Sequence, residues 1–153
     1  MTAILSESCP MTEAAPSYPT DFQIPSDTAE ARRVQEEIEQ QLRSLSYSDK
    51  EIFSIRLALE EALVNAIKHG NQMDRSKQVR VAYLVERERF DVFIADEGAG
   101  FDPQDVPDPT APENLERPCG RGLMLMRHYM TAVDYNGKGN AVRMFKLRNG
   151  TPK

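Results

Sequence analysis

The sequence predicts a two-layer α+β sandwich, with a mixed, mostly antiparallel sheet and helices on one of its faces. Segments whose apolar residues recur with the helical period are grouped between segments in which apolar and polar residues alternate, a grouping typical of this class. The chain has 153 residues, of which 40% are hydrophobic and 28% charged, so we expect one globular domain with a substantial core.

Composition also narrows the range of functions. The formal net charge of −5 argues against a surface that binds nucleic-acid backbones, which needs clustered Lys and Arg, and favours a protein or small-molecule partner. Cys9 and Cys119 lack metal-ligand spacing and form no disulfide framework, although a disulfide between them is left open. No apolar run reaches the roughly 20 residues of a membrane helix. We therefore expect a cytoplasmic protein with no direct nucleic-acid or membrane partner.

The first half of the chain predicts a flexible tail, a strand and two helices. Ser26 or Asp27 is expected to cap the first helix, with Glu30 reaching back to the cap. The second helix begins at the capping-box pattern SDKE, and Gly70 is expected to end it. The expected elements are the tail over residues 1–20, the strand over 21–25, and helices over about 27–45 and 48–70.

The second half predicts two hairpins separated by a long loop and a helix. The loop, residues 98–119, has prolines that exclude a regular helix or a central strand, and such long loops are usually functional lids. The expected elements are a hairpin within 77–98, a helix after Gly122, and strands over 132–135 and 141–147. The domain is thus predicted over residues 21–148, with a short C-terminal tail over 149–153.

Glu61 and Asn65 are one helical turn apart in the second predicted helix, beside its apolar stripe. The asparagine offers a hard carbonyl oxygen suited to Mg²⁺, which takes few protein ligands alongside phosphate oxygens. The glutamate is placed to accept a proton from a hydroxyl or water that attacks a phosphoryl group. The alternative is that both residues lie on an ordinary solvated helix face.

Two glycine-containing motifs add to this pair. Asp96 follows an apolar strand and precedes Gly98 and Gly100, so its carboxylate is placed to accept the amino hydrogen of adenine; the alternative is an ordinary glycine turn. Gly120 and Gly122 open the next helix, whose free backbone N–H groups attract phosphate. A lone G-x-G also suits a lid hinge, which does not exclude phosphate binding.

The three motifs, in this order, resemble those of the Bergerat-fold ATPases, the superfamily of DNA gyrase, heat-shock chaperones and sensor histidine kinases. EALVNAIKHG resembles the asparagine box, DEGAGF the adenine aspartate with its glycines, and GRGLMLM the helix after the ATP lid. The resemblance covers roughly residues 21–147. Within the superfamily, the short domain and its E-A-x-x-N-A-x-x-H-G pattern look most like the anti-sigma-factor serine kinases of bacterial partner-switching systems.

The resemblance implies roles for the matching residues. Glu61 would be the base that activates a serine hydroxyl, whereas the neighbouring Glu60 points elsewhere on the helix. The nucleotide site would use Asn65 for Mg²⁺ and the phosphates, Asp96 for adenine, Gly98 and Gly100 for the pocket floor, and Gly120 and Gly122 for backbone donors to the phosphates.

Five further residues are less defined by the resemblance. Lys68 is placed for a phosphate contact and Arg121 to neutralise a phosphate, with solvated side chains as the alternative for each. His69 is expected to pack or to cap the helix C-terminus. The family often has a threonine near the phosphates in the last hairpin, where this chain has Ala141; Asn140 is the candidate substitute.

The resemblance therefore predicts an ATP- and Mg²⁺-dependent serine protein kinase and anti-sigma factor. It would phosphorylate a serine of an anti-anti-sigma protein and sequester a sigma factor, with the two partners mutually exclusive. The alternative is a nucleotide-binding regulatory module without kinase activity. A sensor histidine kinase is disfavoured because the chain has no room for a helical hairpin with a phospho-accepting histidine. Whether the domain forms a homodimer is left open.

Overall fold

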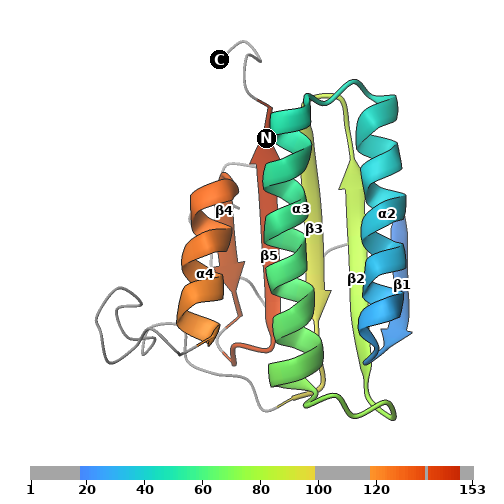
Figure 1. Ribbon diagram of the computed structural model, residues 1–153, viewed down its shortest axis with the longest axis vertical. Coiled ribbons are helices and arrows are strands. Elements are labelled where there is room, and N and C mark those ends of the chain that lie inside the picture. The colour runs from blue at the N-terminus through green and yellow to red at the C-terminus, as the bar shows by residue number, and fades with distance from the viewer. Residues whose placement is uncertain (1–17, 99–117, 137, 149–153) are drawn as a thin grey trace.

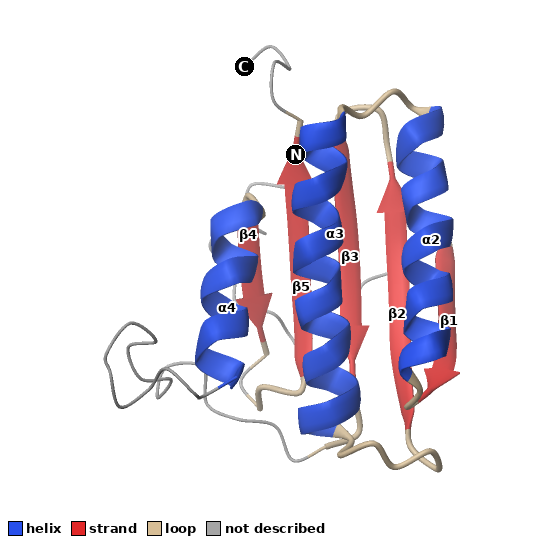
Figure 2. Ribbon diagram, viewed as in Figure 1, coloured by secondary structure: helices blue, strands red, loops and turns tan. Residues whose placement is uncertain are grey.

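The computed structural model describes residues 18–98, 118–136 and 138–148, without the side chains of residues 118–122. Helices cover one face of a single five-stranded sheet, with strand order β1-β2-β3-β5-β4 (Figures 1 and 2). The predicted two-layer α+β class is confirmed. The elements are β1 (Thr20–Pro25), α2 (Thr28–Ser44), α3 (Asp49–Val64), the π-helical turn η1 (Asn65–Gly70), β2 (Gln78–Val85), β3 (Arg89–Ala95), α4 (Pro118–Tyr129), β4 (Ala132–Tyr135) and β5 (Ala141–Leu147).

The sheet departs from the expected mixed pattern, because all four pairings among the described strands are antiparallel. Figure 1 shows the reason: α4 carries the chain to the opposite end of the sheet before β4 runs back and turns into β5. β5 therefore lies between β3 and β4 and runs against both. This return path leaves no parallel pair in the described part of the sheet.

The start of α2 follows the cap that the sequence indicates, with one difference. The side chain of Asp27 accepts a hydrogen bond of 2.9 Å from the N–H of Ala29, so Asp27 is the N-cap. Glu30 was expected to reach back to the cap but instead accepts a hydrogen bond of 2.9 Å from Arg33, one turn ahead. The short aspartate already binds a free N–H group of the first turn, so the glutamate is available to the arginine.

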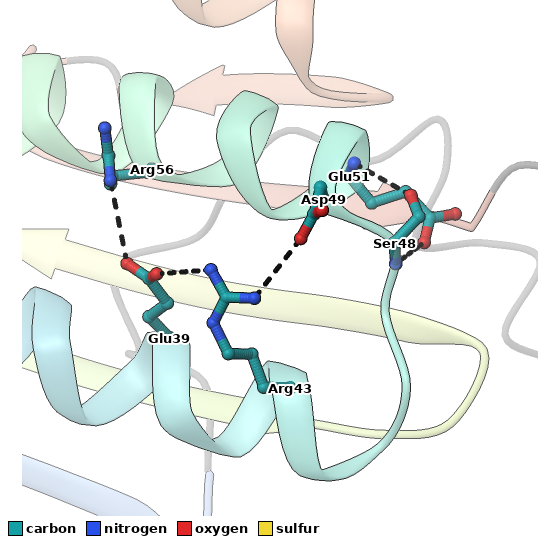
Figure 3. A network of polar contacts seen from close by, with 6 residues as sticks. All are labelled: Glu39, Arg43, Ser48, Asp49, Glu51 and Arg56. Carbon is teal, nitrogen blue, oxygen red and sulfur yellow. Dashed lines mark hydrogen bonds and ion pairs between the residues drawn. The ribbon is translucent and has the colours of Figure 1, made fainter.

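The predicted capping box at the start of α3 is confirmed. The Ser48 hydroxyl accepts from the N–H of Glu51 at 3.1 Å, and the Ser48 N–H donates to Glu51 at 2.8 Å. Figure 3 shows this box beside Arg43 of α2, which reaches Glu39 at 3.0 Å and Asp49 at 3.2 Å. The pair with Asp49 links the end of α2 to the start of α3, the pair with Glu39 lies within α2, and such surface ion pairs add little stability individually.

The core lies between the helices and the covered face of the sheet. Burying a large apolar side chain typically contributes about 1.5–3 kcal/mol, so this layer is the main source of stability. Met126 of α4 is fully buried and Met130 nearly so, whereas Met124 is exposed. The largest fully buried side chains are Tyr83, Phe90, Ile38, Leu42, Ile55, Leu59, Leu63, Ile67, Ile94, Met126, Met144 and Val79.

The helix after the predicted lid begins earlier than expected, at Pro118 rather than after Gly122. Proline is well suited to a first helical turn, because its φ is already helical and its missing N–H would have no partner there. Residues 118 and 119 therefore belong to α4. The remainder of the predicted lid after Gly98 and most of both predicted tails lie outside the described residues, and the domain boundaries stay a prediction.

Four segments that are distant in the sequence lie at one end of the molecule. Figure 1 shows the end of α3, the end of β3, the turn between β4 and β5, and the start of α4 together at this end. The antiparallel strand order produces this gathering, because β3 ends where β5 begins. The motifs selected from the sequence lie on these segments.

Candidate functional site

The helix that carries the Glu61–Asn65 pair changes its winding at Asn65. Over η1 the turns widen, and the N–H of Asn71 donates to the carbonyl of Ala66, five residues earlier, at 2.8 Å. Wide turns of this kind are rare and often occur at functional sites. Gly70 is the last helical residue, as expected, but the left-handed residues that follow the helix are Gln72 and Met73, with φ values of 55° and 60°. Gly70 is therefore needed for another reason.

That reason is the close approach of Gly70 to Asp96. A Cβ placed on Gly70 would overlap the carboxylate of Asp96, and a Cβ on Gly98 would overlap the carbonyl of Gly70. The two glycines thus allow the end of η1 and the segment after β3 to pack backbone against backbone. This contact places the Asp96 carboxylate directly beside the helix end.

A cleft opens where these segments meet the turn between β4 and β5. Its walls include small and apolar side chains together with the carboxamide of Asn65 and the carboxylate of Asp96, so two predicted site residues lie in one cavity. The described residues that line it are Ala62, Asn65, Ala66, His69, Gly70, Ile94, Asp96, Tyr135, Gly139, Asn140, Ala141 and Val142. An apolar pocket with a few convergent polar groups is the usual form of a small-molecule site.

Asp96 is held at the cleft by its neighbours in the chain. The N–H of Gly98 donates to Oδ1 of Asp96 at 2.7 Å, and the N–H of Asp96 donates to the carbonyl of Asn140 at 2.9 Å. Burial raises the pKa of this carboxyl, while the Gly98 N–H and the charge of Lys77 act in the opposite direction. Such a half-buried carboxylate is desolvated and directed, as a hydrogen-bond acceptor for a ligand should be.

A buried asparagine that the sequence analysis did not select supports this segment. Asn71 is 0% exposed, and its Oδ1 accepts from the N–H of Glu97 at 2.8 Å. Its Nδ2 donates to Ser26 at 3.0 Å and to the carbonyl of Gln78 at 3.1 Å. An asparagine after a helix end usually reads as a turn residue, so only its burial in the tertiary structure distinguishes it.

The side chain of Asn140, the candidate substitute for the family's threonine, is hydrogen-bonded to other residues of the protein. Its Nδ2 donates to the carbonyl of Gly98 at 3.2 Å, and its Oδ1 accepts from Asn136 at 2.9 Å. Ala141 lines the cleft at the position where the resemblance places the threonine. In this structure Asn140 therefore holds the segment after Asp96.

Glu61 is half-buried, one turn before Asn65 along the same helix. Burial raises the pKa of its carboxyl, and the negative charge of Glu60 raises it further, whereas His69 lowers it. Glu60 itself is exposed, and its expected direction away from the site stays a prediction. A carboxylate with a raised pKa is a stronger base, which suits acceptance of a proton.

The remaining candidates separate into four groups. His69 was expected to pack or cap; it lies in the last turn of η1 and also lines the cleft. Lys68 is exposed and is not among the described residues that line the cleft, so its phosphate contact stays a prediction. Gly100 lies outside the described residues. Gly120, Arg121 and Gly122 lie in α4 with their backbone described, and their phosphate contacts also stay predictions.

The described residues contain neither a metal-binding cluster nor a membrane-spanning helix. No group of three or more His, Cys, Asp or Glu side chains in the described ranges is arranged to hold a metal ion. Among the same residues, no helix combines the length and the apolar character that crossing a membrane requires.

The chain is similar to known proteins over most of its length. Residues 24–146 match the model of the histidine kinase-like ATPase domain. Serine-protein kinase RsbW of Bacillus subtilis is 33% identical over 113 residues, which cover 69% of this chain and 71% of that protein. Serine/threonine-protein kinase BtrW of Bordetella bronchiseptica is 33% identical over 85 residues, which cover 54% of this chain and 60% of that protein.

A solved structure shares the fold. The crystal structure of the RsbU and RsbW domains of Rv1364c from Mycobacterium tuberculosis superposes with a TM-score of 0.54 at 16% sequence identity. The match covers 88% of this chain and 33% of that chain, so this chain corresponds to about a third of the larger protein.

Proposed function

Because this chain belongs to the histidine kinase-like ATPases, and within them to the anti-sigma-factor serine/threonine-protein kinases that use ATP, we propose that it phosphorylates a serine of an anti-anti-sigma protein. We further propose that it sequesters a sigma factor when the anti-anti-sigma protein is not bound. We also propose that it acts in the cytoplasm, where sigma factors are found. The relatives named serine-protein kinase support the transfer reaction, and partner exchange is the regulatory form that the family resemblance implies.

The observation that carries the proposal is the presence of Asn65 and Asp96 in one cleft. Asp96 has one oxygen bound by the Gly98 N–H, and we assign its other oxygen to the amino group of adenine. The small and apolar side chains of Ala62, Ala66 and Ile94 suit the faces of the base. Asn65 lies on the helix side of the same cavity, toward which the phosphates would extend.

The residues present also fit a magnesium ion bound with ATP. Asn65 offers a neutral, hard carbonyl oxygen, and a single protein ligand is sufficient when phosphate oxygens and water complete the octahedron. When bound, the ion would neutralise charge that develops on the transferred phosphoryl group. The contribution of the chain is to position Asn65 at the end of α3, a helix held by a stripe of buried side chains.

Glu61 is the proposed catalytic base. As the serine oxygen forms its bond to the γ-phosphorus and the bond to the ADP oxygen breaks, the hydroxyl proton passes to the Glu61 carboxylate. The raised pKa of Glu61, caused first by burial and then by Glu60, strengthens the carboxylate as a proton acceptor. Positioning and charge neutralisation supply most of the acceleration in such reactions, so no covalent enzyme intermediate is required.

The alternative function keeps the nucleotide site without the kinase reaction. In that case ATP binding would only bias which protein partner is bound. The burial of Glu61 favours the kinase. Partial burial of a carboxylate costs desolvation free energy, and a module that only binds nucleotide has no use for such a group at this position.

Three variants distinguish the two functions. Glu61→Gln should keep Mg²⁺–ATP affinity within about twofold and lower phosphate transfer to a serine-bearing anti-anti-sigma protein by at least about 100-fold. Asn65→Ala should weaken Mg²⁺–ATP binding as well. The matched control is Glu60→Gln, which removes the adjacent exposed carboxylate and should leave transfer at neutral pH unchanged.

Calorimetric titration with Mg²⁺–ATP and a radiolabel transfer assay provide the two measurements. Equal loss of ATP binding in Glu61→Gln and Asn65→Ala would contradict the separate roles. Undiminished transfer in Glu61→Gln would reject the base, and an ATP-binding parent that transfers no phosphate would favour the regulatory module.

A further inference from the structure

The structure holds Asp96 through both of the peptide groups that flank it. On one side, the N–H of Asp96 donates to the carbonyl of Asn140 at 2.9 Å. On the other, the N–H of Glu97 donates to Oδ1 of Asn71 at 2.8 Å. With both peptide groups anchored, the direction of the Cα–Cβ bond of Asp96 is determined, and the Gly98 N–H then selects the side-chain rotamer.

Of the two anchoring groups, the Asn140 carbonyl belongs to the backbone, whereas Asn71 acts through its side chain and so depends on its residue type. It is 0% exposed, and Ser26, which it contacts, is 1% exposed. The hydroxyl of Ser26 accepts from Nδ2 of Asn71 and donates to the carbonyl of Lys77 at 2.8 Å. Asn71, which directly follows η1, thereby joins the link between β1 and α2, the start of β2 and the segment after β3, all separated in the sequence.

Only a carboxamide satisfies this set of contacts. The N–H of Glu97 requires an acceptor, whereas the Ser26 oxygen and the carbonyl of Gln78 require donors. A carboxylate would direct an oxygen at the Gln78 carbonyl, and an alanine would leave buried polar groups without a partner. The three distances, from 2.8 to 3.1 Å, fit one orientation of the amide.

We propose that Asn71 is a positioning residue that sets the orientation of Asp96 and thereby the preference of the cleft for adenine over guanine. The inference rests on the proposed function, because it takes Asp96 as the group that reads the base. A correctly placed carboxylate accepts from the amino group of adenine and faces the O6 acceptor of guanine unfavourably. A carboxylate free to shift loses this discrimination before it loses affinity for the phosphates.

The test compares Asn71→Ala with Ser26→Ala. Both variants remove a member of the same buried network, but only the first removes the acceptor for the Glu97 N–H. Titration with ATP and with GTP, at a temperature where each variant is folded, gives the ratio of the two affinities. Amide hydrogen exchange of Glu97 in the nucleotide-free protein reports on the anchor directly.

We expect Asn71→Ala to lower the ATP-to-GTP affinity ratio by about tenfold and to speed Glu97 exchange by at least about tenfold. Ser26→Ala should keep the ratio within about twofold despite a comparable loss of thermal stability. An unchanged ratio in folded Asn71→Ala, or an equal loss of the ratio in Ser26→Ala, would overturn the inference.

If Asn71→Ala does not fold, a second variant, Asn71→Asp, tests the inference. Asn71→Asp keeps the acceptor for Glu97 and should retain the ATP-to-GTP ratio while lowering stability; loss of the ratio in this folded variant would overturn the inference. Failure of the proposed function gives a different result. A parent protein that binds no ATP would reject the nucleotide site, and one that binds ATP and GTP equally would reject Asp96 as the group that reads the base. Slow Glu97 exchange in Asn71→Ala would reject the anchor.

Discussion

The α-carbon of Gly70 lies so close to the carboxylate of Asp96 that a Cβ on residue 70 would overlap the carboxyl carbon and both oxygens. The last helical residue of the asparagine-containing motif thus contacts the side chain of the aspartate motif. The packing of these two residues joins the two halves of the proposed nucleotide site.

This contact predicts that Gly70→Ala weakens ATP binding strongly and lowers the free energy of unfolding only slightly. The added methyl group meets a side chain, which can rotate away, so the fold is kept while Asp96 leaves its position. We expect ATP affinity to fall by at least about tenfold, with a loss in unfolding free energy of about 1 kcal/mol or less. Calorimetric titration and denaturant unfolding measure the two effects.

Gly98→Ala provides the contrast, because its Cβ would overlap the backbone carbonyl of Gly70. Backbone cannot rotate away, so we expect a loss of about 1–3 kcal/mol in unfolding free energy. If Gly70→Ala proved the more destabilising of the two variants, the assignment of a movable and an immovable neighbour would be wrong.

Asp96→Asn should remove one pH-dependent contribution to the stability of the nucleotide-free protein. Burial raises the pKa of Asp96 above its ordinary value of 3.8, so the folded state holds its proton more readily than the unfolded state does. The stability contributed by this group is therefore greatest at low pH and declines as pH rises through the interval between the two pKa values. The variant lacks that decline and should be at least as stable as the parent at neutral pH.

Denaturant unfolding of the parent and of Asp96→Asn is measured between pH 4 and 7 without nucleotide. The difference between their unfolding free energies at each pH gives the contribution of Asp96. Asp21 and Asp27, whose pKa values are lowered by Arg80 and Arg75, contribute with the opposite sign but equally in both proteins. A variant that is less stable than the parent at neutral pH would contradict the burial argument.

Glu60→Gln should shift the pH dependence of phosphate transfer. The reaction needs Glu61 unprotonated, so its rate rises with pH through the pKa of Glu61. Glu60 raises that pKa by its negative charge, and removing the charge should move the acid limb of kcat/KM to lower pH. Since Glu60 is exposed, high salt should move the parent's limb in the same direction. A shift to higher pH would reject the electrostatic coupling.

Arg148→Ala should destabilise the fold without weakening ATP binding. The guanidinium donates to the carbonyls of Leu45, Arg87 and Ser46 at 3.2, 2.9 and 2.6 Å, and lies over the ring of Tyr47. Loss of these contacts should lower the unfolding free energy by about 2–4 kcal/mol. Arg148 directly follows β5, whose first residue, Ala141, lines the cleft; in Figure 1, β5 runs from that end of the sheet to the opposite one.

Arg148→Lys is the control for charge, because a lysine cannot donate in several directions from a rigid plane and should recover only part of the loss. A drop in ATP affinity in either folded variant would show that the two ends of the sheet are coupled, contrary to this prediction.

Features that depend on neighbours in the chain were predictable. The cap at Asp27, the box of Ser48 and Glu51, and the strands Ala132–Tyr135 and Ala141–Leu147 were all expected from local patterns and are present. These patterns work because caps and periodicities involve residues at most a few positions apart. The early start of α4 was missed because Pro118 was counted among the loop prolines that exclude a regular helix, whereas a proline fits the first turn of a helix.

Patterns in the chain were enough to predict the α+β class, the extents of most elements, and Glu61, Asn65 and Asp96 as candidate site residues. The packing of Gly70 against Asp96, the burial of Asn71 and the antiparallel pairing of all described strands became visible only in the folded protein. Residues 71 and 97 meet because the helix formed by α3 and η1 ends at the same end of the molecule as β3. Such a contact depends on the path of the whole chain, which no short pattern encodes.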